Sequence, residues 1–258
     1  MSVTGQSSSA TTPPRSARNV PGWQSATVIA ILQEAPDAVT LRLSLAEVAR
    51  FRAGQYYNVR IPIPGRPRPI QRAYSIGSSP VPASNVIDIG VKETPGGLIS
   101  PILVNGLSVG DSIEVRGPYG RFVWDEEVDR PTLLVGAGSG MVPLMSMIRY
   151  AAATGHDSAV RLVCSASDFN HAFYAEELAL LDRRHHWLSV THCITRDPGE
   201  SRAAHHRRID AGILESVVRP AAVERAYICG PPAMVEDASG SLAALGLGPE
   251  AILTEKFN

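Results

Sequence analysis

The feature that most constrains the fold of this chain is a change of sequence pattern near residue 130. Before it, short apolar and β-branched runs are separated by glycine and proline, a spacing typical of an antiparallel β-barrel. After it, short apolar strands alternate with helical segments, as in a parallel sheet covered by helices on both faces. The sequence therefore predicts two domains of different fold class.

The first half is predicted to form an antiparallel β-barrel with one short helix. The helix is expected near residues 97–105, after the glycine pair Gly96-Gly97. The acidic stretch 125–127 marks the boundary, so the barrel domain spans residues 24–127. The predicted strands are residues 26–32, 39–45, 56–63, 72–76, 86–91 and 112–116.

The second half is predicted to be an α/β domain over residues 128–258. Pro143 suits the first turn of a helix, and Asp210 is placed to open another. Further helices are expected around residues 174–184 and after residue 232. The predicted strands of the parallel sheet are residues 131–135, 159–164, 188–194, 225–229 and 251–257.

Composition excludes several classes of protein. A chain with 44% hydrophobic and 19% charged residues can build a core, and it lacks an apolar run of the roughly 18 residues that cross a bilayer. A formal net charge of -1 argues against a nucleic-acid or membrane-surface binder. Residues 1–23 predict a disordered leader, because they are rich in small polar residues and lack the apolar segment of a secretory signal. A transit peptide is the alternative.

The cysteines and histidines do not have the spacing of a metal site. Cys164, Cys193 and Cys229 are far apart, which excludes a plant-type iron–sulfur centre within this sequence and fits a reducing cytoplasm better than secretion. The histidine pairs at 185–186 and 205–206 are sequence neighbours and do not share a helix face. We therefore expect a cytoplasmic protein without a bound metal.

The segment Arg72-Ala73-Tyr74-Ser75 is suited to a flat, anionic ligand. The guanidinium of Arg72 can pair with phosphate, the ring of Tyr74 can stack on an aromatic system, and the hydroxyl of Ser75 can hydrogen-bond a ring nitrogen. The alternative is an ordinary strand with an ion-paired arginine and a buried tyrosine.

Two turns in the second half are suited to a second phosphate ligand. Residues 136–143 read G-x-G-x-G-x-x-P between a strand and a helix, where glycines admit a pyrophosphate and the helix start offers free N–H groups. A merely tight turn is the alternative. Residues 229–234, which read CGPPAM, end the fourth predicted strand. Because ligands bind at the carboxyl ends of parallel strands, both turns are expected to open onto one crevice.

The chain resembles the ferredoxin–NADP reductase family of flavoproteins over residues 25–258. Six segments carry the resemblance, in this order: RAYS, VKETPGGLIS, GPYGRF, GAGSGMVP, CGPPAM and TEKF. The resemblance implies an FAD-binding barrel followed by a nicotinamide-dinucleotide domain, with the two ring systems meeting between them. It also implies a stand-alone reductase without an iron–sulfur module.

The resemblance further implies roles for individual residues. Ser75 would lie near the flavin N5, Cys229 beside the nicotinamide C4, and Glu255 and Phe257 at the flavin edge. Phe257 would cover the flavin until nicotinamide displaces it, or else plug the core at the strand end. The FAD contacts would be Arg72, Ala73, Tyr74, Ser75, Val91, Lys92, Gly97, Leu98, Ile99, Ser100 and Phe257. The NAD(P) contacts would be Gly136, Gly138, Ser139, Gly140, Pro143, Ser165, Ser167, Arg196, Cys229, Gly230, Pro231, Pro232 and Met234.

The implied function is that of an NAD(P)H-dependent, FAD-containing reductase. Hydride would pass from NADH or NADPH to FAD, and single electrons would then pass to a separate ferredoxin or another one-electron carrier. Two alternatives stay open: a reductase of free flavin, quinone or ferric chelates, and a flavin-binding subunit without turnover. One chain that carries both cofactor sites can work as a monomer.

The choice between NADH and NADPH also stays open. Relatives that use NADPH often place an arginine where this chain has Ser167, and an inward-pointing Asp168 would repel a 2′-phosphate. Arg196, at the end of the next strand, would supply the positive charge that Ser167 lacks.

A run of arginines predicts a docking surface for an acidic ferredoxin. No acidic residue occurs between positions 50 and 72, so these arginines are expected to form a basic rim beside the flavin, with a solvated strand face as the alternative. The arginines are Arg50, Arg52, Arg60, Arg66, Arg68 and Arg72.

Overall fold

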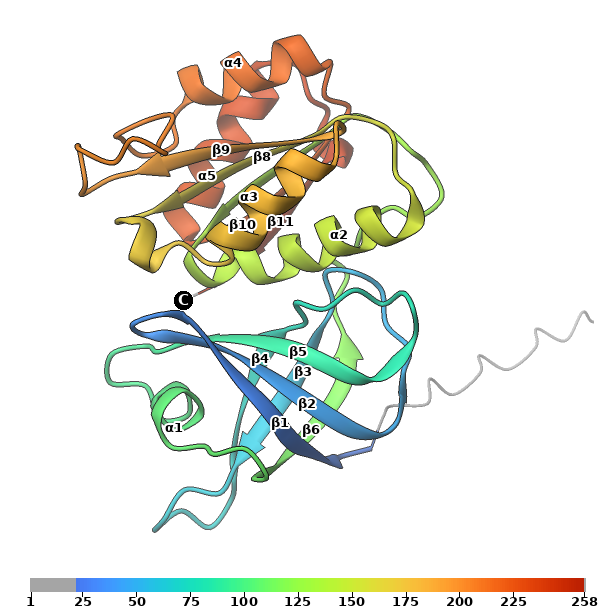
Figure 1. The fold of residues 1–258 in the computed structure, drawn as a ribbon, viewed down its shortest axis with the longest axis vertical. Helices are drawn as coiled ribbons and strands as arrows, with labels where there is room; N and C mark the ends of the chain where they lie inside the picture. Colours follow the sequence, from blue (N-terminus) through green and yellow to red (C-terminus); the bar gives the residue numbers. More distant parts are fainter. Residues whose placement is uncertain (1–21, 258) are drawn as a thin grey trace, which may run out of the picture.

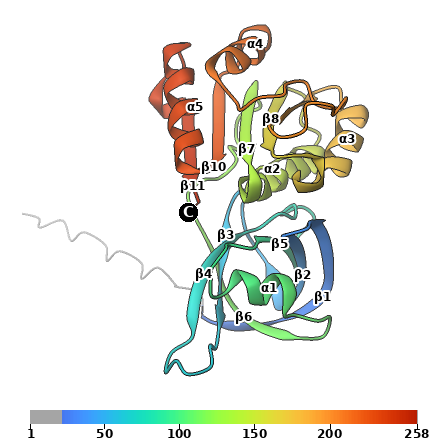
Figure 2. The same cartoon turned by 90° about the vertical axis from the view of Figure 1, so that its left-hand side faces the viewer.

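The computed structural model describes residues 22–257 and contains two sheets that differ in strand direction. Figures 1 and 2 show two bodies stacked along the long axis of the molecule, with the C-terminus between them. An antiparallel first body and a parallel second body confirm the predicted fold class. The predicted leader lies, except for residues 22 and 23, outside the described residues.

The first body is a six-stranded antiparallel sheet with the strand order β4-β3-β6-β1-β2-β5. A bridge between Ile76 and Ile89 links its two edges, so the sheet curls around one apolar core. Along β3, Tyr57, Val59 and Ile61 enter this core and alternate with half-buried residues, as the two-residue period of a strand requires. The strands are β1 (Gln24–Ala35), β2 (Ala38–Ala49), β3 (Tyr56–Ile61), β4 (Ile70–Ser75), β5 (Ser84–Lys92) and β6 (Ser112–Tyr119).

The short helix of the first body, α1 (Ser100–Asn105), begins later than the predicted residue 97. Pro101 suits its first turn, because proline lacks the N–H that this turn leaves unpaired. The preceding residues form a separate turn, in which the Gly97 N–H donates to the Thr94 carbonyl at 2.8 Å and Gly96 has a φ of 73°. Leu103 anchors the helix in the barrel core.

The second body is a five-stranded parallel sheet with the strand order β11-β10-β7-β8-β9. Asp210 opens a helix as predicted, since its carboxylate accepts from the Ile213 N–H. The strands are β7 (Thr132–Ala137), β8 (Val160–Ala166), β9 (Leu188–Ile194), β10 (Arg225–Gly230) and β11 (Ile252–Lys256). The helices are α2 (Met141–Thr154), α3 (Ala175–Arg184), α4 (Ala211–Ala221) and α5 (Pro232–Ala244), with short 3-10 turns η1 (Gly138–Gly140), η2 (Phe169–His171) and η3 (Pro249–Ala251).

Helices cover both faces of the parallel sheet, as the sequence predicts. Along β7, Leu134 packs in one core with α2 and α3, while Leu133 and Val135 pack in the other core with α4 and α5. Figure 2 shows the two pairs of helices on opposite sides of the strands. Within residues 22–257, every helix is too short or too polar to cross a membrane.

Candidate functional site

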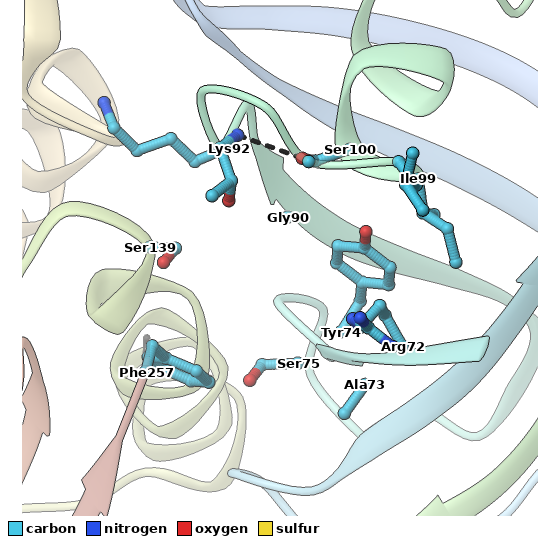
Figure 3. Close-up of a pocket in the computed structure, with 13 residues that line it drawn as sticks. Arg72, Ala73, Tyr74, Ser75, Gly90, Lys92, Ile99, Ser100, Ser139 and Phe257 are labelled. Carbon is cyan, nitrogen blue, oxygen red and sulfur yellow. Dashed lines mark hydrogen bonds between the residues drawn. The ribbon is translucent and has the colours of Figure 1, made fainter. Parts of the chain in front are cut away.

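A pocket of about 460 Å³ lies where the two bodies meet. Its volume falls in the range of small-molecule sites, roughly 300–1,000 Å³. Figure 3 shows side chains from β4, β5 and the start of α1 on one side, and Ser139 and Phe257 from the second body on the other. The lining residues are Arg72, Ala73, Tyr74, Ser75, Gly90, Lys92, Thr94, Gly97, Leu98, Ile99, Ser100, Ser139 and Phe257.

Strand β4 supplies an aromatic ring, a cation and a hydroxyl to this pocket. Burial raises the pKa of Tyr74 to about 12, so its phenol stays neutral. The Arg72 guanidinium donates to the Gln71 carbonyl at 2.9 Å, and no carboxylate of the described residues pairs with it. Ser75 is almost fully buried at the end of the strand. The segment can therefore receive a flat, anionic ligand.

The turn before α1 closes one side of the pocket. The Thr94 N–H donates to the Ser100 hydroxyl at 2.9 Å, which Figure 3 marks with a dashed line. A side chain at Gly97 would bring its Cβ within 2.9 Å of the Thr94 carbonyl oxygen, so the turn requires glycine there. Lys92 is tied to Asp37 by an ion pair of 2.8 Å. Val91 is fully buried in the barrel core and does not line the pocket.

Gly90 and Thr94 line the pocket, although they were not among the predicted site residues. A Cβ at Gly90 would lie 2.2 Å from a methyl carbon of Val142, so the second body rests directly on β5 at this point. A glycine inside an otherwise apolar strand is a sequence signal for such close approach.

The two predicted phosphate turns lie against each other. A Cβ at Gly140 would be 2.1 Å from the Cys229 carbonyl oxygen, and one at Gly230 would be 3.4 Å from the Ala137 N atom. Gly138 has a φ of 56°, which favours glycine. Pro143 is buried in α2, whereas Pro231 is exposed before α5. The two turns therefore pack together at the carboxyl ends of β7 and β10, and a common crevice there stays a prediction.

Cys229 and Glu255 are neighbours on β10 and β11, where they are register partners. Burial raises the pKa of the Cys229 thiol, and the nearby Glu255 carboxylate raises it further. Burial also raises the pKa of Glu255 to about 7, and its Oε2 has no hydrogen-bond partner among the described residues. The pair thus offers a neutral thiol and a carboxyl group that titrates near neutral pH. Phe257 follows and donates its N–H to the Gly230 carbonyl at 3.1 Å.

Three further predicted residues, Ser165, Ser167 and Arg196, lie at the ends of β8 and β9, away from the pocket lining. The Arg196 N–H donates to the Ser167 carbonyl at 2.8 Å, which joins the two strand ends. The Asp168 carboxylate caps η2 and pairs with His171 at 2.8 Å, and the hydrogen bond from His171 lowers the pKa of Asp168. Ser165 is half-buried on β8, and Met234 lies on α5 beneath Gly230.

The prediction that the arginines between positions 50 and 72 form one basic surface is wrong. Arg60 pairs with Glu114 and Arg52 pairs with Glu126, so acidic residues from distant segments neutralise both. The hairpin between β3 and β4, which carries residues 66 and 68, projects away from the second body in Figures 1 and 2. Spacing in the sequence did not reveal these partners because they come from β6 and from the connection after it.

Comparison with known proteins identifies both bodies. The family model of an oxidoreductase FAD-binding domain matches residues 25–124, and that of an oxidoreductase NAD-binding domain matches residues 134–240. Among solved structures, the FAD/NAD-binding domain of a nitric oxide dioxygenase from Vibrio cholerae superposes with a TM-score of 0.81 at 24% identity, covering 91% of this chain and 98% of that one. A cytochrome P450 reductase from Amycolatopsis gives a TM-score of 0.78 at 27% identity, covering 93% and 72%.

Curated relatives include reductase components of oxygenase systems. The reductase component of propane 2-monooxygenase from Rhodococcus jostii is 33% identical, covering 86% of this chain and 60% of the relative. The reductase component of the naphthalene 1,2-dioxygenase/salicylate 5-hydroxylase systems from Ralstonia is 32% identical, covering 90% and 68%. The chain thus spans about two thirds of the length of these relatives.

Proposed function

Because the chain belongs to the ferredoxin–NADP reductase family of flavoproteins, we propose that it is an NAD(P)H-dependent, FAD-containing reductase of a separate one-electron carrier. The pocket shared by both bodies carries this proposal: Tyr74 of the first body lies across from Ser139 and Phe257 of the second. Such a pocket brings a flavin on the first body next to a nucleotide on the second.

The residues of the first body fit FAD. Bound FAD supplies the redox chemistry, since it accepts hydride from a nicotinamide and releases electrons one at a time. In the proposal, Arg72 pairs with the pyrophosphate, because its guanidinium has no carboxylate partner among the described residues. Tyr74 would stack on the flavin ring, and the hydroxyl of Ser75, which lines the same pocket in Figure 3, would lie at the ring edge. The partly buried Phe257 shields the ring from water.

The second body binds the nicotinamide nucleotide in this proposal. The glycine turn at η1 admits the pyrophosphate, because a Cβ at Gly138 would meet only the Lys92 side chain, at 4.0 Å, which leaves the backbone open to a ligand. Cys229 packs as a neutral thiol rather than attacking as a nucleophile, since burial raises its pKa. Glu255 holds or releases a proton near neutral pH, since burial raises its pKa to about 7.

The partner we propose is a ferredoxin-type carrier or an oxygenase component. The support is the naming of several relatives as reductase components of oxygenase systems. A cytoplasmic location is also proposed, since the three cysteines are free and buried.

The proposal is tested by steady-state assays of the FAD-loaded protein with NADH or NADPH and three acceptors: a [2Fe–2S] ferredoxin, free FMN and ferric citrate. We expect the ferredoxin to be reduced with the highest kcat/KM. Efficient reduction of only the two small acceptors would establish the small-molecule reductase instead. Firmly bound FAD with no turnover of any acceptor would establish the flavin-binding subunit.

A further inference from the structure

Helix α2 is joined to the first body by two hydrogen bonds to consecutive carbonyl groups. The Ser146 hydroxyl donates to the Ser78 carbonyl at 2.7 Å, and the Arg149 Nη1 donates to the Gly77 carbonyl at 2.7 Å. Ser146 and Arg149 are three residues apart and therefore project from the same face of the helix. Figure 1 shows α2 as the helix of the second body that lies directly on the barrel.

The loop that receives these bonds is fixed to the strands of the pocket. It follows β4, which ends at Ser75. The Gly77 N–H donates to the Asp88 carbonyl at 2.7 Å, and the Ser78 hydroxyl accepts from the Asp88 N–H at 3.1 Å. Both carbonyl acceptors are therefore held in a fixed position relative to β4 and β5.

Arg149 also joins this contact to a second helix. Its Nε and Nη2 donate to the two carboxylate oxygens of Glu177 on α3, at 2.8 and 2.5 Å, and its guanidinium lies 5.1 Å from the Tyr174 ring centre. Burial alone would lower the pKa of Arg149, but Glu177 raises it above its ordinary value, so the side chain stays charged. Only a planar group with several donors can make this set of contacts.

Helix α2 begins at the glycine turn whose Ser139 lines the pocket. A shift of α2 on the barrel would therefore move the nucleotide site relative to Tyr74 and Ser75. We propose that Arg149, supported by Ser146, is a positioning residue that sets the distance between the nicotinamide and flavin rings. This inference rests on the proposed function, and it assigns Arg149 no contact with either cofactor.

The test compares Arg149→Ala and Ser146→Ala with wild type in anaerobic stopped-flow reduction of the FAD-loaded protein. Since a displacement of about 1 Å can slow a reaction roughly 100-fold, we expect the limiting rate to fall by about that factor in Arg149→Ala and by less in Ser146→Ala. The nucleotide dissociation constant is expected to change less than about threefold, because neither side chain lines the pocket or belongs to the glycine turn. Arg219→Ala is the matched control, since Arg219 is exposed and pairs with Glu215 on its own helix, α4.

Hydrogen exchange of the FAD-free proteins supplies a readout that does not depend on activity. We expect peptides that cover residues 76–79 and 141–149 to exchange faster in Arg149→Ala than in wild type or Arg219→Ala. The inference would be overturned if the limiting rates of flavin reduction in both α2 variants stayed within twofold of wild type. It would also be overturned if the nucleotide dissociation constant rose by the same factor as the limiting rate fell. If neither nucleotide reduced the flavin of the wild-type protein, the proposed function would fail. If hydrogen exchange in Arg149→Ala matched that of wild type, the contact between α2 and the first body would be refuted separately.

Discussion

The carboxyl group of Glu255 provides a quantitative prediction about stability. Burial raises its pKa from the ordinary 4.5 to about 7, and its Oε2 has no partner among the described residues. The folded state therefore binds a proton at pH values where the unfolded chain has already released it. The stability that this group contributes is fully present below pH 4.5 and is lost as the pH rises through 7.

The size of the effect follows from the two pKa values. A change from 4.5 to about 7 corresponds to at most about 3 kcal/mol, and partial exposure of the side chain reduces this to about 1–2 kcal/mol. Glu255→Gln keeps the shape of the side chain but cannot ionise. We expect the variant to gain about 1–2 kcal/mol relative to wild type between pH 5 and pH 8.

The assay is urea unfolding of the FAD-free protein at pH 5, 6, 7 and 8 for wild type, Glu255→Gln and the control Glu224→Gln. Glu224 is exposed immediately before β10, so its variant should follow the wild-type pH profile. A stability difference between Glu255→Gln and wild type that stays constant over this range would contradict a raised pKa of Glu255. It would show that the Glu255 carboxyl is solvated in the folded protein.

Three further substitutions test the site. Tyr74→Ala removes the stacking ring, so we expect the FAD dissociation constant to rise about tenfold in a fluorescence titration, and unchanged affinity would argue against stacking. Asp168→Ala removes a carboxylate from the end of β8, so the ratio of kcat/KM for NADPH to that for NADH should rise about tenfold, which corresponds to 1.4 kcal/mol; an unchanged ratio would place the 2′-phosphate elsewhere. Gly140→Ala forces a Cβ to within 2.1 Å of the Cys229 carbonyl oxygen, and the resulting strain should lower stability by about 1–3 kcal/mol in urea unfolding. Wild-type stability of that variant would contradict the close packing of the two turns.

The antiparallel first sheet and the parallel second sheet could be predicted, because closely spaced strands and strands that alternate with helices have different sequence patterns. The strand at 188–194 has the predicted bounds, since apolar and β-branched residues are frequent there and the polar residues 195–197 follow directly. The helix predicted from residue 97 was less accurate, because a Gly-Gly pair can either precede a helix or form a separate turn. Here the Ser100 hydroxyl accepts from the Thr94 N–H and stabilises the turn.

Contacts between distant segments could not be predicted from the sequence. The arginines at 52 and 60 looked unpaired because Glu126 and Glu114 lie more than fifty residues further along the chain. The bonds of Arg149 were missed for the same reason, since its acceptors belong to the other body and to α3. The segment at 72–75 could be singled out from the sequence because its guanidinium, aromatic ring and hydroxyl are neighbours on one strand.

In the proposed function, both bodies act together as an NAD(P)H-dependent flavin reductase. The most direct test is anaerobic stopped-flow absorbance of the FAD-loaded protein, mixed separately with NADH and with NADPH. We expect at least one nucleotide to bleach the flavin band rapidly, at a rate that saturates with nucleotide concentration. Tightly bound FAD that neither nucleotide bleaches would contradict it.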